Sequence, residues 1–396
     1  MKALIVSLYY SPELGAAPSR ITNMAEGLQK EGVEVEVLTA LPNYPKGRIY
    51  EGYRRKFSMH EKVNDVLVHR YWTFATVTKN PILRLLSMFA FSMMLWCFAF
   101  KRNLIKSYDY IIIQTPPIMV AHSAIVLFKK LYGKKIILNV SDLWPASAIE
   151  LGAVKKGSIY HKVLLHMEKF IYHNAYAFQG QSKVILGHIK EFEPTKKQFL
   201  YRNLQHQSNV SLVEKKRHTP FKIVYAGLLG VAQDVLSIVE QVNFKELGAE
   251  LHLFGGGNQA NKVQDYIKNH DTGVFYHGYL AKDKMVAELQ EHDASVVPLI
   301  VQIKGAVPSK IFDLMPVGVP ILLCGGSEAA DIVNDNKIGF VSSPKDYRGL
   351  AENISRLINM SDGEYLNMVN NCLSASSNEY SFEKQMKRYS QFLVHL

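Results

Sequence analysis

The chain has 396 residues, of which 48% are hydrophobic and 20% charged; this composition excludes a disordered chain, and the length suits two hydrophobic cores better than one. Its three cysteines, Cys97, Cys324 and Cys372, are far apart and odd in number, which argues against a disulfide framework or a zinc site. The net charge of +11 lies in the first half, because residues 1–200 hold 27 Lys and Arg against 14 Asp and Glu.

Short apolar runs rich in β-branched residues alternate with helical stretches along the first half of the chain. Strands are expected at Ala3–Tyr9, Glu34–Thr39, Val66–Trp72, Tyr110–Gln114, Lys135–Val140, Ala177–Gly180 and Phe199–Tyr201. Helices are expected at Ser19–Glu31, Ile82–Ser107, Ile118–Tyr132, Ser158–Asn174 and Lys183–Glu191.

The second half repeats the alternation. Strands are expected at Lys222–Ala226, Glu250–Phe254, Val274–Tyr276, Ala294–Val297, Pro320–Leu323 and Gly339–Val341. Helices are expected at Val231–Val242, Asn258–Lys268, Lys282–Glu291, Ser309–Pro316, Glu328–Asn334 and Tyr347–Asn359, with an amphipathic helix at Ser381–His395. Apolar strands alternating with helices predict parallel sheets covered on both faces.

The pattern therefore predicts two doubly wound, Rossmann-like α/β domains that face each other across a cleft. The joint is expected within Asn203–Pro220, which is polar and aperiodic and ends in proline. The domains would span residues 1–205 and 206–378, and residues 379–396 would form a helix that crosses back to the first domain. Ligands of such sheets bind beyond the carboxyl ends of the strands.

The segment Leu83–Phe100 is strongly apolar and ends against Lys101 and Arg102. Its 18 residues approach the roughly 20 needed to span a bilayer, but a span would place parts of one sheet on opposite sides. A helix in the membrane interface is favoured over a core helix or a span. Its apolar contacts would be Leu83, Phe89, Phe91, Trp96 and Phe98.

The uneven charge favours a polyanionic partner over a merely solvated basic surface. No nucleic-acid-binding motif accompanies it, so an anionic membrane surface is the expected partner and no nucleic acid is expected. Together with the apolar segment, this predicts peripheral or monotopic association with a membrane.

Two motifs follow strands or begin helices in ways that suit an anionic ligand. After the first strand, Gly15 and Ala16 leave room for close approach to the backbone, and a helix begins beside them. In the second half, Pro308 and Ser309 read as a helix start, with Lys310 and Asp313 one turn apart on one face. Lys310 is suited to bind a diphosphate, and Asp313 is suited to accept hydrogen bonds from hydroxyl groups. The simpler interpretations are a tight strand-to-helix turn for the first motif and a surface ion pair for the second.

Together with other motifs, these residues resemble the retaining glycosyltransferase family 4, which has the two-domain GT-B fold. PSKIFDLMPVGVPI, beginning at Pro308, resembles its donor-binding helix, and FGGG, beginning at Phe254, its glycine-rich turn. SPELGAAPSR, TALPNYPKG and EGY, in residues 11–53, resemble its acceptor-side loops. VSDLWP with the later LG, in residues 140–152, and YAGLLGVAQ, beginning at Tyr225, resemble a bacterial branch that builds surface polysaccharides and includes fucosamine-type transferases.

The resemblance implies a role for each motif. The nucleotide, expected to be UDP, would bind the second domain, and its diphosphate would meet Lys310, the N–H groups of Leu229 and Gly230, and the helix start. Asp313 would hold ribose, and Asp142 would contact the reacting sugar or the acceptor. The donor-side residues implied are Gly15, Ala16, Gly227, Leu229, Gly230, Gln233, Gly255, Gly256, Pro308, Ser309, Lys310 and Asp313. Arg20, Asn43, Tyr44 and Trp144 would lie on the acceptor side, and Asp142 and Lys310 would be catalytic.

The sequence departs from the family pattern at several positions. The first glutamate of its Glu-x7-Glu motif is Gly305 and the second is Asp313. Leu228 and Gln233 stand where an arginine and a lysine usually neutralise the diphosphate, so Lys310 should carry more of that charge. These departures leave a catalytically inactive partner subunit open as an alternative.

The expected reaction is a metal-independent, retaining transfer of an amino sugar or deoxy amino sugar in O-antigen or capsule synthesis. The expected acceptor is a polyprenyl-diphosphate-linked saccharide at the cytoplasmic face of the bacterial inner membrane. No cofactor is expected, because no D-x-D triplet and no His/Cys cluster with ligand spacing is present. A nucleotide-sugar epimerase is a further alternative.

Overall fold

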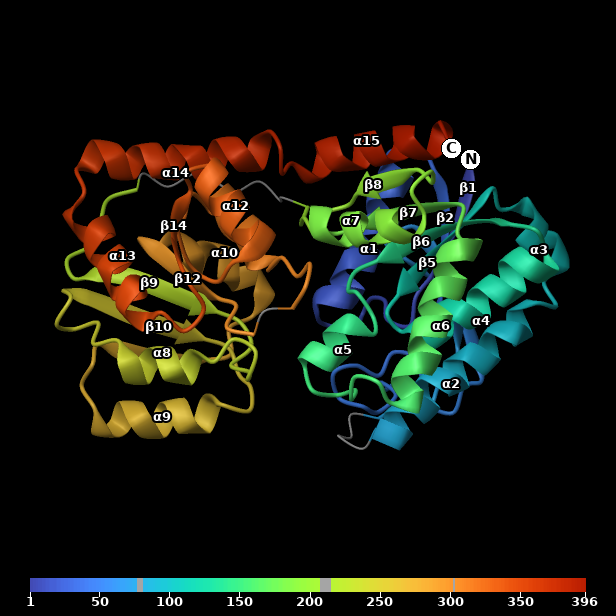
Figure 1. Cartoon of the computed structure of the whole chain (residues 1–396), viewed down its shortest axis with the longest axis horizontal. Helices are drawn as coiled ribbons and strands as arrows, with labels where there is room; N and C mark the ends of the chain where they lie inside the picture. The colour runs from blue at the N-terminus through green and yellow to red at the C-terminus, as the bar shows by residue number, and fades with distance from the viewer. Residues whose placement is uncertain (77–80, 207–214, 302) are drawn as a thin grey trace. The chain divides into compact units, whose positions relative to one another are not determined.

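The computed structural model of the chain describes residues 1–76, 81–206, 215–301 and 303–396 (Figure 1). The chain divides into two compact units. The first contains Met1–Gln205 and Phe382–Leu396, and the second contains His206–Ser381. The return to the first unit thus begins three residues later than expected from the sequence, and residues 207–214 of the expected linker lie outside the described ranges.

The first unit is built on an eight-stranded sheet of order β3-β4-β2-β1-β5-β6-β7-β8. Its strands are β1 (Lys2–Val6), β2 (Glu34–Ala40), β3 (Ser58–Val63), β4 (Val66–Tyr71), β5 (Tyr110–Thr115), β6 (Lys135–Val140), β7 (Ala177–Gly180) and β8 (Gln198–Leu200). All neighbours pair in parallel except β3 and β4. Strand β3 was not predicted, because its polar sequence SMHEKV suits an exposed edge and carries no buried run.

Helices cover this sheet (Figure 1). They are α1 (Ala16–Lys30), α2 (Pro81–Phe98), α3 (Arg102–Ser107), α4 (Ile118–Ile125) with a π-helical extension (Val126–Leu131), α5 (Ala146–Glu150), α6 (Ile159–Asn174), α7 (Lys183–Phe192) and α15 (Phe382–Val394). The single helix predicted over Ile82–Ser107 is wrong, because a turn separates α2 from α3. No glycine or proline marks this turn, so the sequence pattern could not reveal it.

Helix α2 has two different apolar faces. Phe91, Leu95 and Phe98 are fully buried in the core of the first unit. On the opposite side, Phe89 is 51% and Met93 48% exposed, and Leu86 and Trp96 are exposed as well. The prediction that Phe91 and Phe98 contact a membrane is therefore wrong, because the periodic apolar sequence does not say which stripe faces the sheet. Leu83 is half-buried. Among the described residues, no helix has the length and apolar character to cross a membrane.

The second unit has a six-stranded parallel sheet of order β11-β10-β9-β12-β13-β14. The strands are β9 (Phe221–Ala226), β10 (Ala249–Phe254), β11 (Val274–Gly278), β12 (Ala294–Pro298), β13 (Ile321–Cys324) and β14 (Gly339–Ser342). The helices are α8 (Val235–Gln241), α9 (Ala260–Asn269), α10 (Lys282–Gln290), α11 (Lys310–Leu314) with a 3-10 turn (Met315–Val317), α12 (Ser327–Asp335), α13 (Tyr347–Asn359) and α14 (Asp362–Ser377). The sequence analysis missed α14, whose start is fixed by a capping box between Ser361 and Glu364.

The C-terminal helix α15 packs on α1 in the first unit. A Cβ atom on Gly27 would lie 2.7 Å from Met386 Cγ, so α1 needs glycine at this point of contact. The Gln385 side chain accepts a hydrogen bond from Arg202 N (2.8 Å) and donates one to Arg202 O (3.0 Å). The last 15 residues are thereby part of the first unit's core.

Candidate functional site

In the second unit, Lys310 lies against the backbone turn that follows β9. Its Nζ donates a hydrogen bond to Tyr225 Oη (3.2 Å) and lies 4.4 Å from the centre of that ring. A Cβ atom on Gly227, which has φ 155°, would lie 2.3 Å from the same nitrogen. Tyr225 Oη in turn donates to Leu228 O (2.6 Å). One tyrosine therefore fixes both the lysine and the turn, and only glycine leaves room for the amine at this place.

The environment of Lys310 disfavours the charged form of its amine. Burial lowers the pKa of its ammonium to about 8, and the negative charge of Asp313 opposes that shift. The expected helix over residues 309–316 is only the five-residue α11 followed by a 3-10 turn, and its start has no side-chain cap. Ser309 has helical backbone angles there, and Pro308 accepts a hydrogen bond from Ile311 N.

The glycines after β10 let the loop that follows β10 pack closely on the loop that follows β9. A Cβ atom on Gly255 would lie 1.9 Å from Gly227 O, and one on Gly257 would lie 2.3 Å from Leu229 O. The N–H of Leu229 donates to Gly256 O (2.9 Å), and its side chain is fully buried. The prediction that the Leu229 N–H meets a diphosphate is thus wrong for this conformation, because the neighbouring loop already accepts that hydrogen bond.

The turn after β9 presents apolar side chains to solvent. Leu228 is 62% and Val231 65% exposed. A Cβ atom on Gly230 would lie 2.9 Å from Gln233 Oε1, and that oxygen is buried without a hydrogen-bond partner among the described residues. Gln233 therefore offers a buried acceptor beside the turn in place of a cation.

In the first unit, the loops after β1 and β2 meet. Gly15 (φ 141°) is the residue before α1, and a Cβ atom on it would lie 3.0 Å from Tyr44 Cε1. The rings of Tyr9 and Tyr44 lie 5.3 Å apart. Tyr44 is 41% exposed, whereas Asn43 is buried and donates from its side chain to Leu41 O. The structure thus brings Gly15 and Tyr44 together, with the exposed Ala16 next to them.

A second polar group lies beyond the carboxyl ends of β6 and β7. The buried guanidinium of Arg20 donates to Gln181 Oε1 (2.7 Å), and Gln181 Nε2 donates to Ser141 O (2.5 Å). Burial raises the pKa of Asp142, and the charge of Arg20 and a hydrogen bond from Ser141 oppose the shift. Trp144, expected on the acceptor side, is partly buried and packs against the core of this unit. Gln181 was missed because no motif marks a lone glutamine after a strand.

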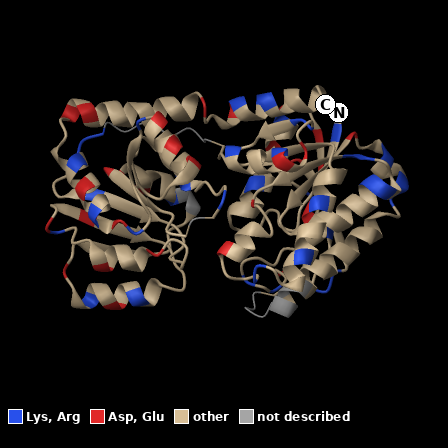
Figure 2. Ribbon diagram, viewed as in Figure 1, with Lys and Arg blue, Asp and Glu red and all other residues tan. Residues whose placement is uncertain are grey.

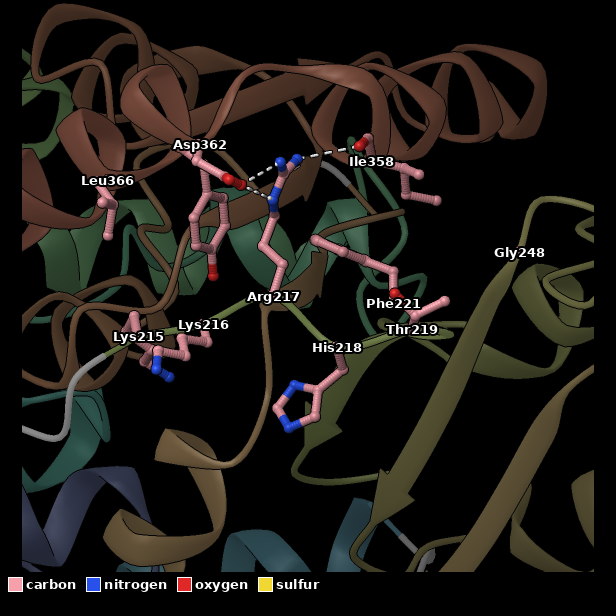
Figure 3. A pocket seen from close by; sticks show the side chains of 11 residues that line it. Lys215, Lys216, Arg217, His218, Thr219, Phe221, Gly248, Ile358, Asp362 and Leu366 are labelled. Atoms are coloured by element: carbon pink, nitrogen blue, oxygen red, sulfur yellow. Dashed lines mark hydrogen bonds and ion pairs between the residues drawn. The ribbon is translucent and has the colours of Figure 1, made fainter.

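The described residues also contain a pocket of about 520 Å³ away from these groups, at the amino ends of β9 and β10 (Figure 3). It is lined by Lys215, Lys216, Arg217, His218, Thr219, Phe221, Gly248, Ile358, Asp362, Tyr365 and Leu366. Arg217 pairs with Asp362 and donates to the carbonyl oxygens of Leu357, Ile358 and Met360. This arginine caps the end of α13 and is occupied by the protein itself.

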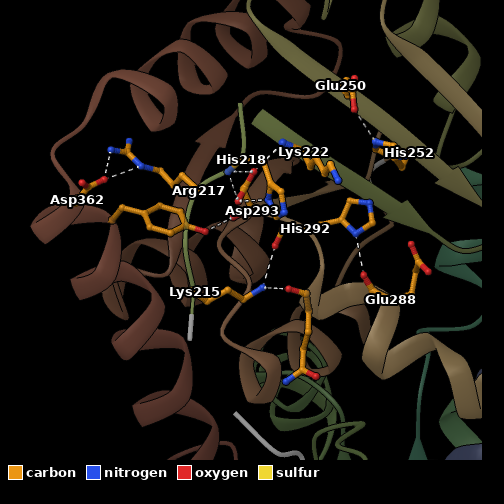
Figure 4. A network of polar contacts seen from close by, with 12 residues as sticks. Lys215, Arg217, His218, Lys222, Glu250, His252, Glu288, His292, Asp293 and Asp362 are labelled. Atoms are coloured by element: carbon orange, nitrogen blue, oxygen red, sulfur yellow. Dashed lines mark hydrogen bonds and ion pairs between the residues drawn. The ribbon is translucent and has the colours of Figure 1, made fainter. Parts of the chain in front are cut away.

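Buried Asp293 ties the same edge together (Figure 4). Its carboxylate accepts hydrogen bonds from His218 N and Nδ1 and from Lys222 N, and its carbonyl accepts one from Tyr365 Oη. Lys215 donates to the carbonyl oxygens of Gln290 and His292. These contacts join the strand ends to α14 and have a structural purpose.

In the part of the chain that the structure describes, no group of three or more His, Cys, Asp or Glu is arranged to hold a metal ion. Lys310 and Arg20 are cationic side chains that could meet a phosphorylated ligand. Each lies at the carboxyl edge of its own sheet, the edge at which α/β proteins bind ligands.

Two family models match the chain. Residues 15–196 match the glycosyl transferase 4-like domain, and residues 220–360 match glycosyl transferases group 1, so that together they cover most of the sequence. The fold and these matches define a GT-B-fold glycosyltransferase. The chain belongs to glycosyltransferase family 4.

Similar proteins agree with this assignment. WcaI of Escherichia coli (strain K12), named for a glycosyl transferase of colanic acid biosynthesis, is 24% identical over 80% of this chain and 82% of its own. Sucrose-phosphate synthase from Thermosynechococcus elongatus has a TM-score of 0.74 at 12% identity, covering 100% of this chain and 98% of the other. HepE from Anabaena, solved in complex with UDP, has a TM-score of 0.67 at 13% identity and full coverage of both chains. These two structures share the fold.

Proposed function

We propose that this glycosyltransferase moves a sugar from a UDP-sugar to a lipid-linked saccharide, with retention of anomeric configuration, in the synthesis of a bacterial surface polysaccharide. The observation that carries the donor half is the Lys310 amine held on the Gly227 turn. UDP is chosen because HepE was solved with it, and the polysaccharide role because WcaI is named for one. The proposed sugar is an N-acetylated or deoxy amino sugar.

The donor half would work by electrostatics. As the glycosidic bond to the diphosphate breaks, negative charge grows on the leaving phosphate, and the Lys310 ammonium would stabilise it. The N–H of Gly230 and the start of α11 at Pro308 and Ser309 would contact the same group, and Asp313 would accept from ribose hydroxyls. With Leu228 and Gln233 uncharged, Lys310 would supply most of the positive charge.

The acceptor half would use the first unit. Asp142 would contact the reacting sugar or the acceptor, and Arg20 beside it would supply donors to sugar oxygens. Asn43 and Tyr44 would line the acceptor side, because the second carries an exposed ring at the carboxyl edge of the sheet. Trp144, which is partly buried, would contact a sugar with the exposed part of its ring.

The lipid of the acceptor would remain in the membrane beside α2. The exposed side chains of Leu86, Phe89, Met93 and Trp96 form a stripe along this helix. Basic residues accompany it on neighbouring segments (Figure 2), namely Arg102 and Lys106 on α3, Lys129 and Lys130 after α4, and Lys162 and Lys169 on α6. An apolar stripe with basic neighbours suits the anionic surface of the cytoplasmic leaflet.

The test is a transfer and hydrolysis screen of the purified full chain in detergent with UDP-, GDP- and dTDP-sugars, with and without EDTA. We expect nucleotide release from one UDP-sugar, insensitive to EDTA, and an activity loss of at least a hundredfold in Lys310→Ala. Lys337→Ala, which removes an exposed lysine elsewhere in the second unit, is the matched control.

Other outcomes would replace the proposal. No release from any donor, with or without a polyprenyl-diphosphate-linked acceptor, would favour a catalytically inactive partner subunit. Conversion of one UDP-sugar into its epimer without an acceptor would favour an epimerase. Full activity in Lys310→Ala would show that Lys310 does not contribute to the donor site.

A further inference from the structure

Glu13 joins two loops of the first unit through a buried carboxylate. Its side chain is 4% exposed. Oε1 accepts hydrogen bonds from Asn43 N (2.8 Å) and Tyr44 N (2.8 Å), and Oε2 accepts one from Tyr10 N (3.1 Å). The two amides on Oε1 belong to the loop after β2, whereas Tyr10 and Glu13 itself belong to the loop after β1. One side chain therefore satisfies three buried N–H groups and holds two separate loops in register.

Arg70 on β4 also holds the loop after β1. The fully buried Arg70 donates to Ser11 O and pairs with Glu61. Its guanidinium lies 5.4 Å from the ring centre of Tyr53 and 6.0 Å from that of Tyr10. The loop after β1 is therefore held by charged groups on both sides. Glu13 accepts hydrogen bonds from the N–H groups of Asn43 and Tyr44, and the Tyr50 hydroxyl donates to Tyr44 O (2.6 Å).

We infer that Glu13 is a positioning residue for acceptor binding: its ionised carboxylate fixes Asn43 and Tyr44 in the arrangement in which they meet the acceptor saccharide. The inference rests on the proposed function for the identity of the acceptor. The Tyr44 ring depends on this arrangement, because it packs within 3.0 Å of the place where a Cβ atom on Gly15 would lie. A shift of the Tyr44 backbone would thus move this exposed ring.

Because Glu13 can gain or lose a proton, the contact between the loops after β1 and β2 is sensitive to pH. Burial raises the pKa of this carboxyl to about 7, and the three backbone donors and the charge of Arg70 oppose that shift. The groups that face it are Arg70, whose charge favours the carboxylate, and the hydroxyl of Tyr50, whose pKa is raised by burial and by the charge of Glu13. A proton on one oxygen turns it from an acceptor into a donor, so that one of the loop contacts is lost below about pH 7.

The experiment compares the full chain with Glu13→Gln and with Glu31→Gln, which removes an exposed carboxylate at the end of α1 in the same unit. Hydrogen exchange of peptides covering residues 41–50 is measured at about pH 6 and pH 8 and corrected for intrinsic exchange. Kinetics with a polyprenyl-diphosphate-linked N-acetylhexosamine give the acceptor KM, and donor hydrolysis without acceptor is followed separately.

We expect the Asn43 and Tyr44 amides to exchange about tenfold faster in Glu13→Gln, and also in the unmodified chain at the lower pH. The acceptor KM should rise about tenfold while donor hydrolysis and kcat stay unchanged, and Glu31→Gln should behave as the unmodified chain. If the Asn43 and Tyr44 amides exchange at equal rates in both variants and at both pH values, the inference is wrong. Because this exchange needs no substrate, failure of the proposed function would appear instead as absent transfer with the exchange effect intact.

If Glu13→Gln does not fold, the pH comparison on the unmodified chain decides alone. A uniform fall in kcat for transfer and hydrolysis, without a change in KM or local exchange, would show that Glu13 only supports the fold. That outcome also overturns the inference.

Discussion

At the scale of single residues, the proposed donor site depends on the amine of Lys310, whose charged form is disfavoured by burial. Lys310 is packed on Tyr225 and Gly227 and donates a hydrogen bond to the uncharged Tyr225 phenol, which does not neutralise the ammonium. The sequence identified Lys310 through its place in a motif. It did not identify Tyr225 as the residue that orients the amine, because nothing in a strand sequence shows which buried hydroxyl meets a lysine 85 residues later.

A pH dependence of nucleotide binding follows from Lys310. Because burial lowers its pKa to about 8, the cationic form that binds a diphosphate is present below this pH and is lost above it. The affinity for UDP should fall about tenfold between pH 7 and pH 9, as measured by calorimetry. Lys310→Arg stays charged over this range and should show a flat profile. An equally flat profile in the unmodified chain would mean that Lys310 does not contact the diphosphate.

At the scale of elements, the pattern of apolar residues located most strands and helices but not their two faces. Helix α2 shows this, because its apolar residues surround it and only packing on the sheet makes Phe91 and Phe98 core while Phe89 and Met93 stay exposed. Edge strand β3 and the break before α3 were missed for the same reason. Their conformation depends on packing against neighbouring elements and not on their own sequence.

The contact between α1 and α15 gives a prediction about stability. Gly27→Leu should destabilise the protein by about 1–3 kcal/mol, because the added side chain must displace Met386. Gly187→Leu is the control: this glycine lies in α7, with no atom within 4 Å of an added Cβ, so the change should be neutral or stabilising. Urea unfolding measures both variants. Equal stability of the two would show that α15 is not seated on α1 in solution.

At the scale of the whole molecule, charge and apolar surface are found in the same half of the chain. The excess of Lys and Arg lies in residues 1–200, and so does the exposed stripe of α2. Sequence alone revealed this coincidence, although the structure was needed to show which side chains of α2 are free to meet a membrane.

Binding to vesicles tests the surface. Replacing Phe89 and Met93 by serine should reduce sedimentation of the protein with anionic vesicles at least about tenfold, because two exposed apolar side chains no longer insert. Leu366→Ser, an exposed position in the second unit, should have no effect. Binding should also weaken from about 0.1 M to 1 M salt, as screening shortens from about 10 Å to 3 Å. Equal binding by the double variant would exclude α2 as the contact.

The sequence by itself determined the two parallel-sheet α/β domains and the family, and it singled out Lys310 as a candidate site residue, because these depend on periodicity and on local motifs of adjacent residues. Tertiary structure alone decided that Gly255 and Gly257 serve the packing of two loops and that the Leu229 N–H is bonded to Gly256 O. It also decided the meeting of Glu13 with Asn43 and Tyr44 and of Arg20 with Gln181, 161 residues further on. Such contacts arise where separate strands end at one edge of a sheet, and no local pattern in the chain encodes which of their side chains will touch.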